Sequence, residues 1–297
     1  MDAPWREQIW GRRLVVAVPY LWLGLFFLAP FAIVLAISLG SADSSQAPPF
    51  NFDKLRQEGV LAALTNYAFL LSDDLYIATY LASLRIAALA TLATLLIGYP
   101  MAYAIARARG PWRMILLVAV VLPFWTSFLI RVYAWIGILG NTGLFNATLI
   151  ALGIIEEPLT ILGTEWAVIF GIVYAYLPFM VLPLYATLEK MDQSLLDAAA
   201  DLGARPMRSF FTITLPLSLP GIVAGSQLVF IPAVGEFVIP DLLGGTDTLM
   251  IGKVLSDEFF SNSDWPVASA VAMVMLLFLV APIAYFQRQR ARARMAV

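Results

Sequence analysis

Long apolar runs alternate with short polar segments along the chain. Six runs are long enough to cross about 30 Å of hydrocarbon as helices, and they cover roughly residues 14–39, 78–106, 112–130, 165–188, 218–240 and 265–286. The first run is too long for the apolar part of a secretory signal, so we interpret it as an uncleaved helix. The pattern predicts an all-α integral membrane protein with about six transmembrane helices.

The same pattern predicts one transmembrane domain over 14–286. It is flanked by a cytoplasmic N-terminal segment, 1–13, and a basic cytoplasmic tail, 287–297, and it contains one long polar loop, 189–217. Hydrophobic residues make up 61% of the chain and charged residues 13%, with a mean hydropathy of +0.84. A soluble core of this size could not bury so much apolar surface.

The residue types that are missing from the chain limit the reactions and ligands that it can support. The chain has no cysteine and no histidine, so disulfides, thiol nucleophiles, imidazole bases and the commonest transition-metal ligands are excluded. The remaining acids and hydroxyls form no convergent acid, base and nucleophile group. We therefore expect neither an enzyme nor a metal site, and no nucleic-acid partner.

Basic residues are distributed unevenly between the two sides of the membrane. If the N-terminus is inside, the inner segments carry thirteen: Arg6, Arg12, Arg13, Arg107, Arg109, Arg113, Lys190, Arg205, Arg208, Arg288, Arg290, Arg292 and Arg294. The outer loops carry four: Lys54, Arg56, Arg131 and Lys253. This bias predicts that both termini are cytoplasmic. The outer loops are acidic, which would concentrate cations there, although acids also accumulate wherever bases are excluded.

The polar loop between the fourth and fifth runs contains signals for two short helices. Ser194 followed by Asp197 is like a capping box, and Asp192 is a second candidate cap. Gly203 suits the left-handed position that ends a helix, and Pro206 suits the first position of the next one. A helix of about eight residues is marginal alone in water, so we expect this loop to bind a partner surface.

This loop resembles the cytoplasmic EAA signature of ABC importer permeases. Asp197-Ala198-Ala199 is followed after three residues by Gly203, and after nine more by Ile213 and then Leu215-Pro216, with Asp in place of the usual Glu. The resemblance implies a coupling helix that seats in a cleft of an ATPase subunit. The residues it assigns to that contact are Asp197, Ala198, Ala199, Asp201, Gly203 and Ala204.

Three further segments resemble the polyamine-type permeases, closest to the putrescine branch. They are FWTSFLIRVYAWIGIL (124–139), LVFIPAVGEFVIPDLLGG (228–245) and DWPVASAVAMVMLL (264–277). The resemblance implies a type I importer fold in the bacterial inner membrane, with a second homologous permease, two ATPase subunits and a periplasmic substrate-binding protein. The chain has no GxxxxGK[ST] motif, so we expect no bound cofactor, with ATP and Mg used by the partner ATPase.

Two charged residues lie within the predicted spans, where an unpaired charge costs at least a few kcal/mol. Glu236 lies where Pro232, Gly235 and Pro240 interrupt a helix and could open a cavity. We hypothesise that Glu236 helps a cationic amine to pass. The alternative is a structural ion pair between Glu236 and Arg85.

Aromatic ring faces can bind ammonium groups and would complete such a pathway. Trp125 is the preferred candidate, because Pro123 and Thr126-Ser127 predict a distorted, polar section of its helix. Membrane aromatics are also common as core residues or interfacial anchors. The other tentative pathway residues are Tyr133, Trp135, Tyr174, Tyr176 and Asp241.

Two other transport functions stay open at this point. An ABC permease for a sulfate-like anion or ferric ion would share the architecture, although Glu236 and the acidic outer loops disfavour it. An ion-coupled secondary carrier that acts alone is disfavoured by the absence of a clear internal repeat and by the elaborate inner loop.

Overall fold

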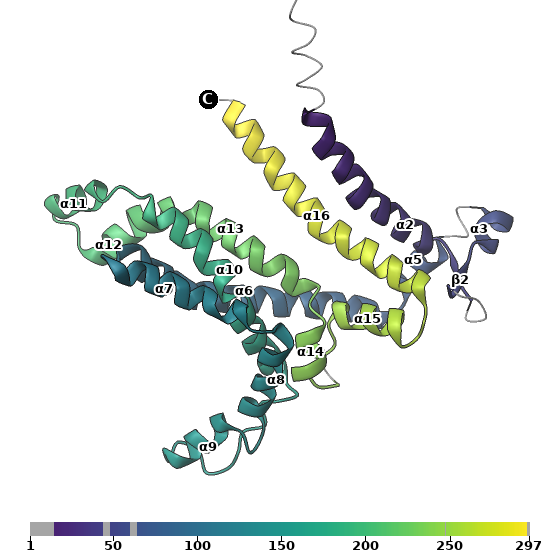
Figure 1. Cartoon of the computed structure of the whole chain (residues 1–297), viewed down its shortest axis with the longest axis horizontal. Helices are drawn as coiled ribbons and strands as arrows, with labels where there is room; N and C mark the ends of the chain where they lie inside the picture. Colours follow the sequence, from purple (N-terminus) through teal and green to yellow (C-terminus); the bar gives the residue numbers. More distant parts are fainter. Residues whose placement is uncertain (1–14, 44–47, 60–63, 247, 296–297) are drawn as a thin grey trace, which may run out of the picture. The chain divides into compact units, whose positions relative to one another are not determined.

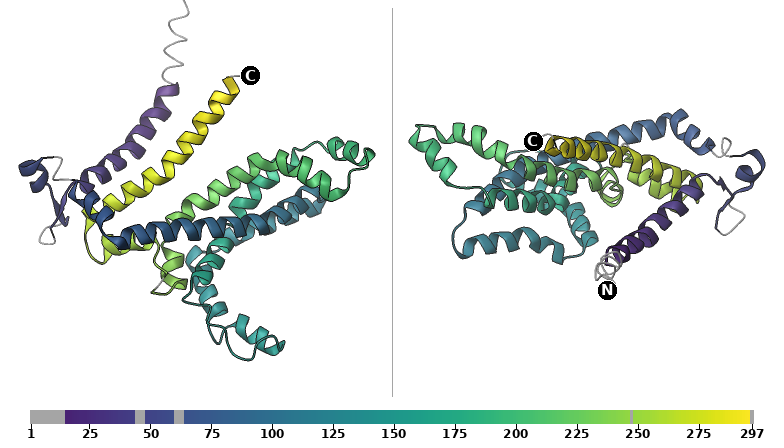
Figure 2. Two further views of the ribbon diagram at one scale, coloured as in Figure 1. Left: turned by 180° about the vertical axis from the view of Figure 1, so that it is seen from behind. Right: turned by 90° about the horizontal axis from the view of Figure 1, so that it is seen from above.

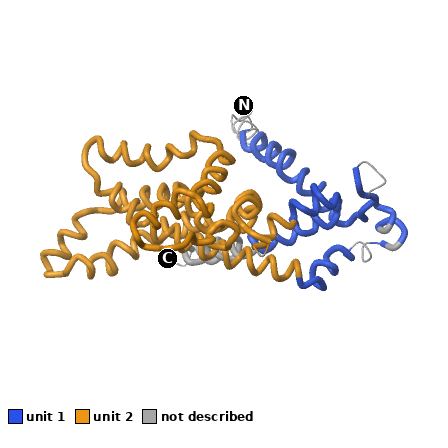
Figure 3. The backbone as a smooth tube through the Cα atoms, turned by 90° about the horizontal axis from the view of Figure 1, so that it is seen from below, with its two compact units in different colours: residues 1–74, 255–297 blue, residues 75–254 orange. Residues whose placement is uncertain are grey.

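A computed structural model describes residues 15–43, 48–59, 64–246 and 248–295. The contacts divide the chain into two compact units, one formed by residues up to Asp74 and from Leu255 onward, and the other by Leu75–Val254 (Figure 3). The predicted segment 1–13 lies outside the described residues, as do the side chains of the tail 287–297. Each unit is almost entirely helical, as predicted.

The first unit pairs the beginning of the chain with its end. Helix 15–38 contains a π-helical turn, η1 (Gly24–Leu28), which leads into α2 (Ala29–Ser38). This helix packs beside the last helix, α16 (Trp265–Met295) (Figure 1). Between them in sequence lie a short antiparallel pair, β1 (Ser41–Ala42) and β2 (Phe50–Asn51), and the helices α3 (Asp53–Glu58) and α5 (Thr65–Ser72).

The second unit is a bundle built around α10. Its elements, in chain order, are α6 (Asp74–Arg107), α7 (Pro111–Val121), η2 (Leu122–Trp125), α8 (Phe128–Leu139), α9 (Leu144–Ala151), α10 (Glu165–Glu189), α11 (Ser194–Asp201), α12 (Pro206–Ser209), η3 (Phe210–Thr214), α13 (Leu215–Val234) and α14 (Val238–Leu243). Helix α15 (Ile251–Phe260) then leads back into the first unit. Figure 2 shows α10 and α13 lying side by side along their length.

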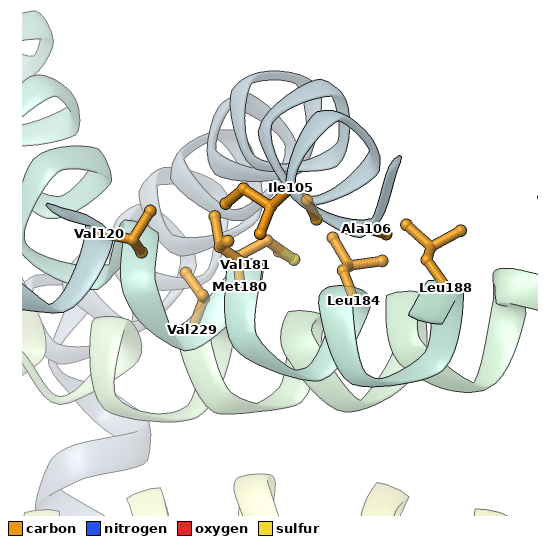
Figure 4. Close-up of a cluster of buried hydrophobic side chains, with 9 residues drawn as sticks. Ile105, Ala106, Val120, Met180, Val181, Leu184, Leu188 and Val229 are labelled. Carbon is orange, nitrogen blue, oxygen red and sulfur yellow. The ribbon is translucent and has the colours of Figure 1, made fainter. Parts of the chain in front are cut away.

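A cluster of fully buried side chains holds α6, α10 and α13 together. Met180, Val181, Leu184 and Leu188 of α10 pack against Ile105 of α6 and its neighbours (Figure 4). Glycine allows these helices to approach closely, because a Cβ at Gly98 of α6 would stand 3.0 Å from Met180 Cγ. Since lipid is as apolar as the side chains, such close packing supplies much of the association between membrane helices.

The apolar runs correspond to helices with two corrections, the first of which is that the helix 128–151 was not among the predicted spans. Among the residues that the structure describes, five helices are long and apolar enough to span a membrane: 15–38, 74–107, 128–151, 165–189 and 206–234. The stretches 111–125 and 265–280 are shorter apolar helices. The predicted span 112–130 is wrong as one helix, because the chain becomes extended at Thr126. The Thr126 N–H and hydroxyl both donate to the Pro123 carbonyl, at 3.3 and 2.8 Å, which ends η2 before α8 begins.

Candidate coupling loop and substrate pathway

The end of α11 is formed by a glycine turn. Gly203 has a φ of +76°, which only glycine adopts at little cost. Its N–H donates to Ala200 O at 2.8 Å, and the Ala204 N–H donates to Ala199 O at 2.9 Å. These two bonds form a Schellman motif. Pro206 then opens α12, so the predicted pair of short helices is confirmed.

The start of α11 differs from the predicted capping box. Ser194 is the first residue of the helix rather than its cap, and its N–H donates to Asp192 Oδ1 at 2.9 Å. Asp192, the second candidate cap, therefore accepts the hydrogen bond of a backbone N–H in the first turn of α11. The Ser194 backbone N–H lowers the pKa of the Asp192 carboxyl, since the bond stabilises the charged form. A negative charge beside the positive end of α11 favours the helix further.

Helix α11 projects beyond the ends of α10 and α13 within the second unit (Figures 1 and 2). Of the six residues predicted to touch an ATPase, Asp197, Ala198, Asp201 and Gly203 are exposed, Ala204 is half-buried and Ala199 is buried at 9% exposure. Leu202 is 89% exposed at the tip. The short helix α11 thus presents an apolar side chain and two acids to solvent.

Glu236 lies in the break between α13 and α14, where Gly235 ends α13. It is 7% exposed. Its Oε2 accepts a hydrogen bond from the Tyr176 hydroxyl of α10 at 2.5 Å, and its Oε1 accepts the N–H of Val238 at 3.1 Å and of Ile239 at 3.4 Å. The carboxylate thus caps the first turn of α14 while it ties that turn to α10.

Helix α15, which follows α14 in the chain, packs against the backbone of the same break. A Cβ at Gly252 would stand 2.5 Å from Gly235 O and 2.6 Å from Glu236 O, so only glycine fits there. The N–H of the preceding residue, Ile251, donates to Ser83 Oγ of α6 at 2.7 Å. The predicted interruption around Gly235 is therefore confirmed as a built element, with three helices holding it.

The proposed alternative pair of Arg85 and Glu236 is corrected by the structure. Arg85 Nη2 of α6 instead bonds to Glu165 Oε2, at the first residue of α10. The Arg85 side chain is 63% exposed, whereas the Glu236 carboxylate is buried and already holds Tyr176 and α14. Arg85 is thus paired with Glu165, and Glu236 is hydrogen-bonded by Tyr176.

The other pathway candidates fall into two groups. Trp135 of α8 and Tyr174 of α10 stack edge to face at 5.4 Å, and Asp241 of α14 pairs with Lys253 at 2.9 Å. Helix α8 packs against both α10 and α14, the two helices that Glu236 joins through Tyr176 and Val238. We call Glu236, Tyr176 and the start of α14 the polar junction. Trp125, at the end of η2, is 79% exposed, and Tyr133 is also exposed. Both present free ring faces at the surface of this single chain.

The sequence does not indicate that Tyr176 bonds to Glu236 or that Lys253 pairs with Asp241. Tyr176 was one of several candidate rings, but it lies 60 residues from Glu236, and no local pattern predicts that contact. Lys253 was counted only as an outer-loop base. The alternation of Gly and Pro around Glu236 was the one signal that pointed to this region.

A bundle of apolar helices from which a pair of short helices projects is typical of the membrane-spanning subunits of ATP-driven importers. The family model described as "Binding-protein-dependent transport system inner membrane component" matches residues 94–292. The chain belongs to this family, whose members are ABC importer permeases, and within it to the polyamine type, as its relatives show.

The relatives named for spermidine and putrescine transport cover nearly the whole chain. The spermidine/putrescine transport system permease protein PotB of Haemophilus influenzae is 42% identical over 93% of both chains, and that of Escherichia coli K12 is 41% identical over 87% of this chain and 90% of the relative. The molybdenum transport system permease protein ModB of Mycobacterium bovis is 32% identical over 68% of this chain and 75% of its own length.

A solved structure shares the fold over its full length. The bacterial alginate ABC transporter, in complex with an alginate pentasaccharide-bound periplasmic protein, contains a chain with a TM-score of 0.69 and 17% identity, covering 98% of both chains. This likeness confirms the type I importer permease fold predicted from the sequence.

Proposed function

We propose that this chain is one of two permease subunits that import polyamines across the inner membrane by alternating access, with putrescine as a principal substrate. The relatives that match over most of its length are named for spermidine and putrescine together. The preference for putrescine rests on the segments 124–139, 228–245 and 264–277. The distribution of basic residues supports a cytoplasmic location for both termini.

The observation that carries the coupling part of this proposal is the exposed, self-contained α11. Its two ends are fixed by Asp192 and Gly203, yet its tip at Leu202 has apolar surface open to solvent. A partner ATPase that binds this tip would transmit its closure to α10 and α13, which α11 and α12 join. The ATPase would bind ATP and Mg, and a periplasmic binding protein would deliver the substrate.

The main rival is an importer of oxyanions, since one relative is named for molybdenum transport. The polar junction in this chain disfavours it, because its buried carboxylate, Glu236, would repel an anion. The exposed Trp125 and Tyr133 rings suit an ammonium group instead. These features favour a cation, and the substrate is the point to test first.

The test is ATP hydrolysis by the complete transporter in lipid, with its binding protein empty or loaded with putrescine, spermidine or molybdate. We expect the polyamine-loaded forms to stimulate hydrolysis severalfold over the empty form, and the molybdate form to have no effect. Stimulation by spermidine alone would remove putrescine as a principal substrate. Stimulation by molybdate alone would overturn the polyamine assignment, and a purified chain without an ATPase would overturn coupling through α11.

Neutralising Glu236 tests its place in the pathway. Glu236→Gln keeps an oxygen for the N–H of Val238 but removes the charge. If the negative charge attracts the passing amine by on the order of 1 kcal/mol, we expect the KM of uptake to rise about fivefold in a complex that assembles normally. Tyr176→Phe is the matched control, since it removes the 2.5 Å hydrogen bond and leaves the charge. Unchanged kinetics in Glu236→Gln would end the pathway role.

A further inference from the structure

A single arginine joins three elements at the end of the bundle that carries α11. Arg113 is the third residue of α7. Its Nε and Nη2 donate to the carbonyls of Ala108 and Ala106, each at 3.3 Å, at the end of α6. Its Nη1 donates to Glu189 Oε1 at 2.8 Å. Glu189 is the last residue of α10. We call Arg113 and Glu189 the elbow clamp.

The elbow clamp lies next to the coupling helix in the chain. Four residues, 190–193, separate Glu189 from the start of α11. Two bonds stiffen this link, because the Met191 N–H donates to Leu188 O at 3.3 Å and the Ser194 N–H donates to Asp192 Oδ1 at 2.9 Å. A displacement of α11 would therefore move the end of α10, and with it the Glu189 carboxylate.

Apolar packing also joins α7 to α10, because Val120 of α7 lies in the same buried cluster as Met180 and Leu184, but it fixes no angle between the helices. Leu184 and Leu188 of α10 meet Ile105 and Ala106 of α6 in the buried cluster of Figure 4. Such contacts have no direction, so helices can slide along them. The fork of the guanidinium fixes an angle as well as a distance, and it holds the carbonyls of α6 and the carboxylate of α10 together from α7.

Stability does not explain the elbow clamp. The Arg113 and Glu189 side chains are 40% and 39% exposed, and exposed ion pairs contribute little to folding because water screens them. The elements that follow α7 in the chain indicate a role in movement instead. Helix α7 continues through η2 to the break at Thr126 and then to α8, which packs against α10 and α14, the two helices that meet at the polar junction.

We propose that Arg113 is a positioning residue for transport: through Glu189 it makes the α6–α7 elbow follow α10 when an ATPase moves α11. The proposal rests on the proposed coupling of this chain to an ATPase. In this arrangement α11 acts on the α7–α8 side of the polar junction, in addition to its direct connection through α10 and α13. Loss of the elbow clamp would uncouple hydrolysis from transport without unfolding the bundle.

The test compares Arg113→Gln and Glu189→Gln with Arg109→Gln, a matched control because Arg109 is exposed on the same elbow. Complete transporters in lipid are assayed for ATP hydrolysis and for polyamine uptake per ATP, with the loaded binding protein. Each elbow-clamp variant is expected to lower uptake per ATP about fivefold or more, with unchanged assembly and melting temperature. The double variant should lose no more than Arg113→Gln alone, because that change already removes the contact with Glu189.

The outcomes separate this proposal from the one on which it rests. Absence of stimulation in the unaltered transporter contradicts the proposed function itself. Normal stimulation there, with uptake per ATP in Arg113→Gln equal to that in Arg109→Gln, overturns the elbow clamp. If Arg113→Gln does not assemble, Glu189→Gln gives the same test from the other side. Failure of both to assemble would make the contact structural and would also overturn the proposal.

Discussion

Replacing Gly221 with leucine is expected to prevent assembly of the permease. Gly221 faces α10 from α13, and a Cβ there would stand 2.7 Å from Thr187 Oγ1 and 3.0 Å from the Pro183 carbonyl oxygen. The carbonyl belongs to the helix backbone and cannot rotate away. Any side chain therefore pushes α13 off α10.

The size of this effect follows from the position of the contact. Gly225, one turn later, meets Met180 in the same way, with a Cβ 2.8 Å from Sδ and 3.1 Å from the carbonyl oxygen. Small residues spaced by four let membrane helices pack backbone to backbone. Overpacking a fitted core costs about 1–3 kcal/mol and occasionally more. Leucine at 221 adds several atoms, so we expect the upper end of that range or beyond.

The measurement is the yield and melting temperature of the detergent-purified complex. Gly221→Leu should lower the yield about tenfold or more, and Gly221→Ala should lower it less. Gly137→Leu is the control, since a Cβ at Gly137 of α8 meets nothing within 4 Å. Gly221→Leu complexes with the yield and melting temperature of the original would show that α10 and α13 do not depend on this close approach.

The parts of the fold that were predictable are those set by neighbours in the sequence. Gly203 and Pro206 determine the ends of two short helices through their own backbone preferences, and Gly235 marks a break for the same reason. Hydropathy located most of the helices. It failed at Thr126, because Trp125 and Phe128 on either side are apolar, whereas the extended backbone of Thr126 and its two bonds to the Pro123 carbonyl end the helix.

The contacts that could not be predicted join residues far apart in the chain. The partners Arg85 and Glu165, Arg113 and Glu189, and Tyr176 and Glu236 are separated by 80, 76 and 60 positions. The sequence indicates that a buried charge needs a partner, but not how neighbouring helices are rotated. The sequence therefore suggested pairing Arg85 with Glu236 only because both are charged residues within predicted spans. In the folded chain, the way in which α6 and α10 face each other places Glu165 beside Arg85.

Replacing Gly203 with valine is expected to weaken the coupling to the ATPase strongly while leaving the permease folded. A Cβ at this position meets nothing within 4 Å, so space is no obstacle. The obstacle is the φ of +76°, which costs a residue with a side chain about 1–3 kcal/mol, and a β-branched one the most. Valine would leave the left-handed region and break the two bonds from Gly203 and Ala204 that end α11.

The consequence falls on the docking surface rather than on the bundle. Without those bonds Leu202 and the acids of α11 would no longer be held in one orientation. The ATPase would then have no ordered helix end to bind. We expect stimulation of ATP hydrolysis by the loaded binding protein to fall about tenfold or more, which is about 1.4 kcal/mol of lost coupling. Yield and melting temperature should stay near those of the original transporter.

Two controls separate the conformation of Gly203 from the mere presence of a side chain. Gly203→Asn adds a side chain that tolerates the left-handed region, and it should keep most of the stimulation. Gly153→Val introduces the same strain at a φ of +69°, in the turn after α9 and far along the chain from α11, and it should leave coupling intact. Full stimulation in Gly203→Val would mean that the ATPase does not need the turn that ends α11, and equal losses in Gly203→Asn would assign the effect to the side chain itself.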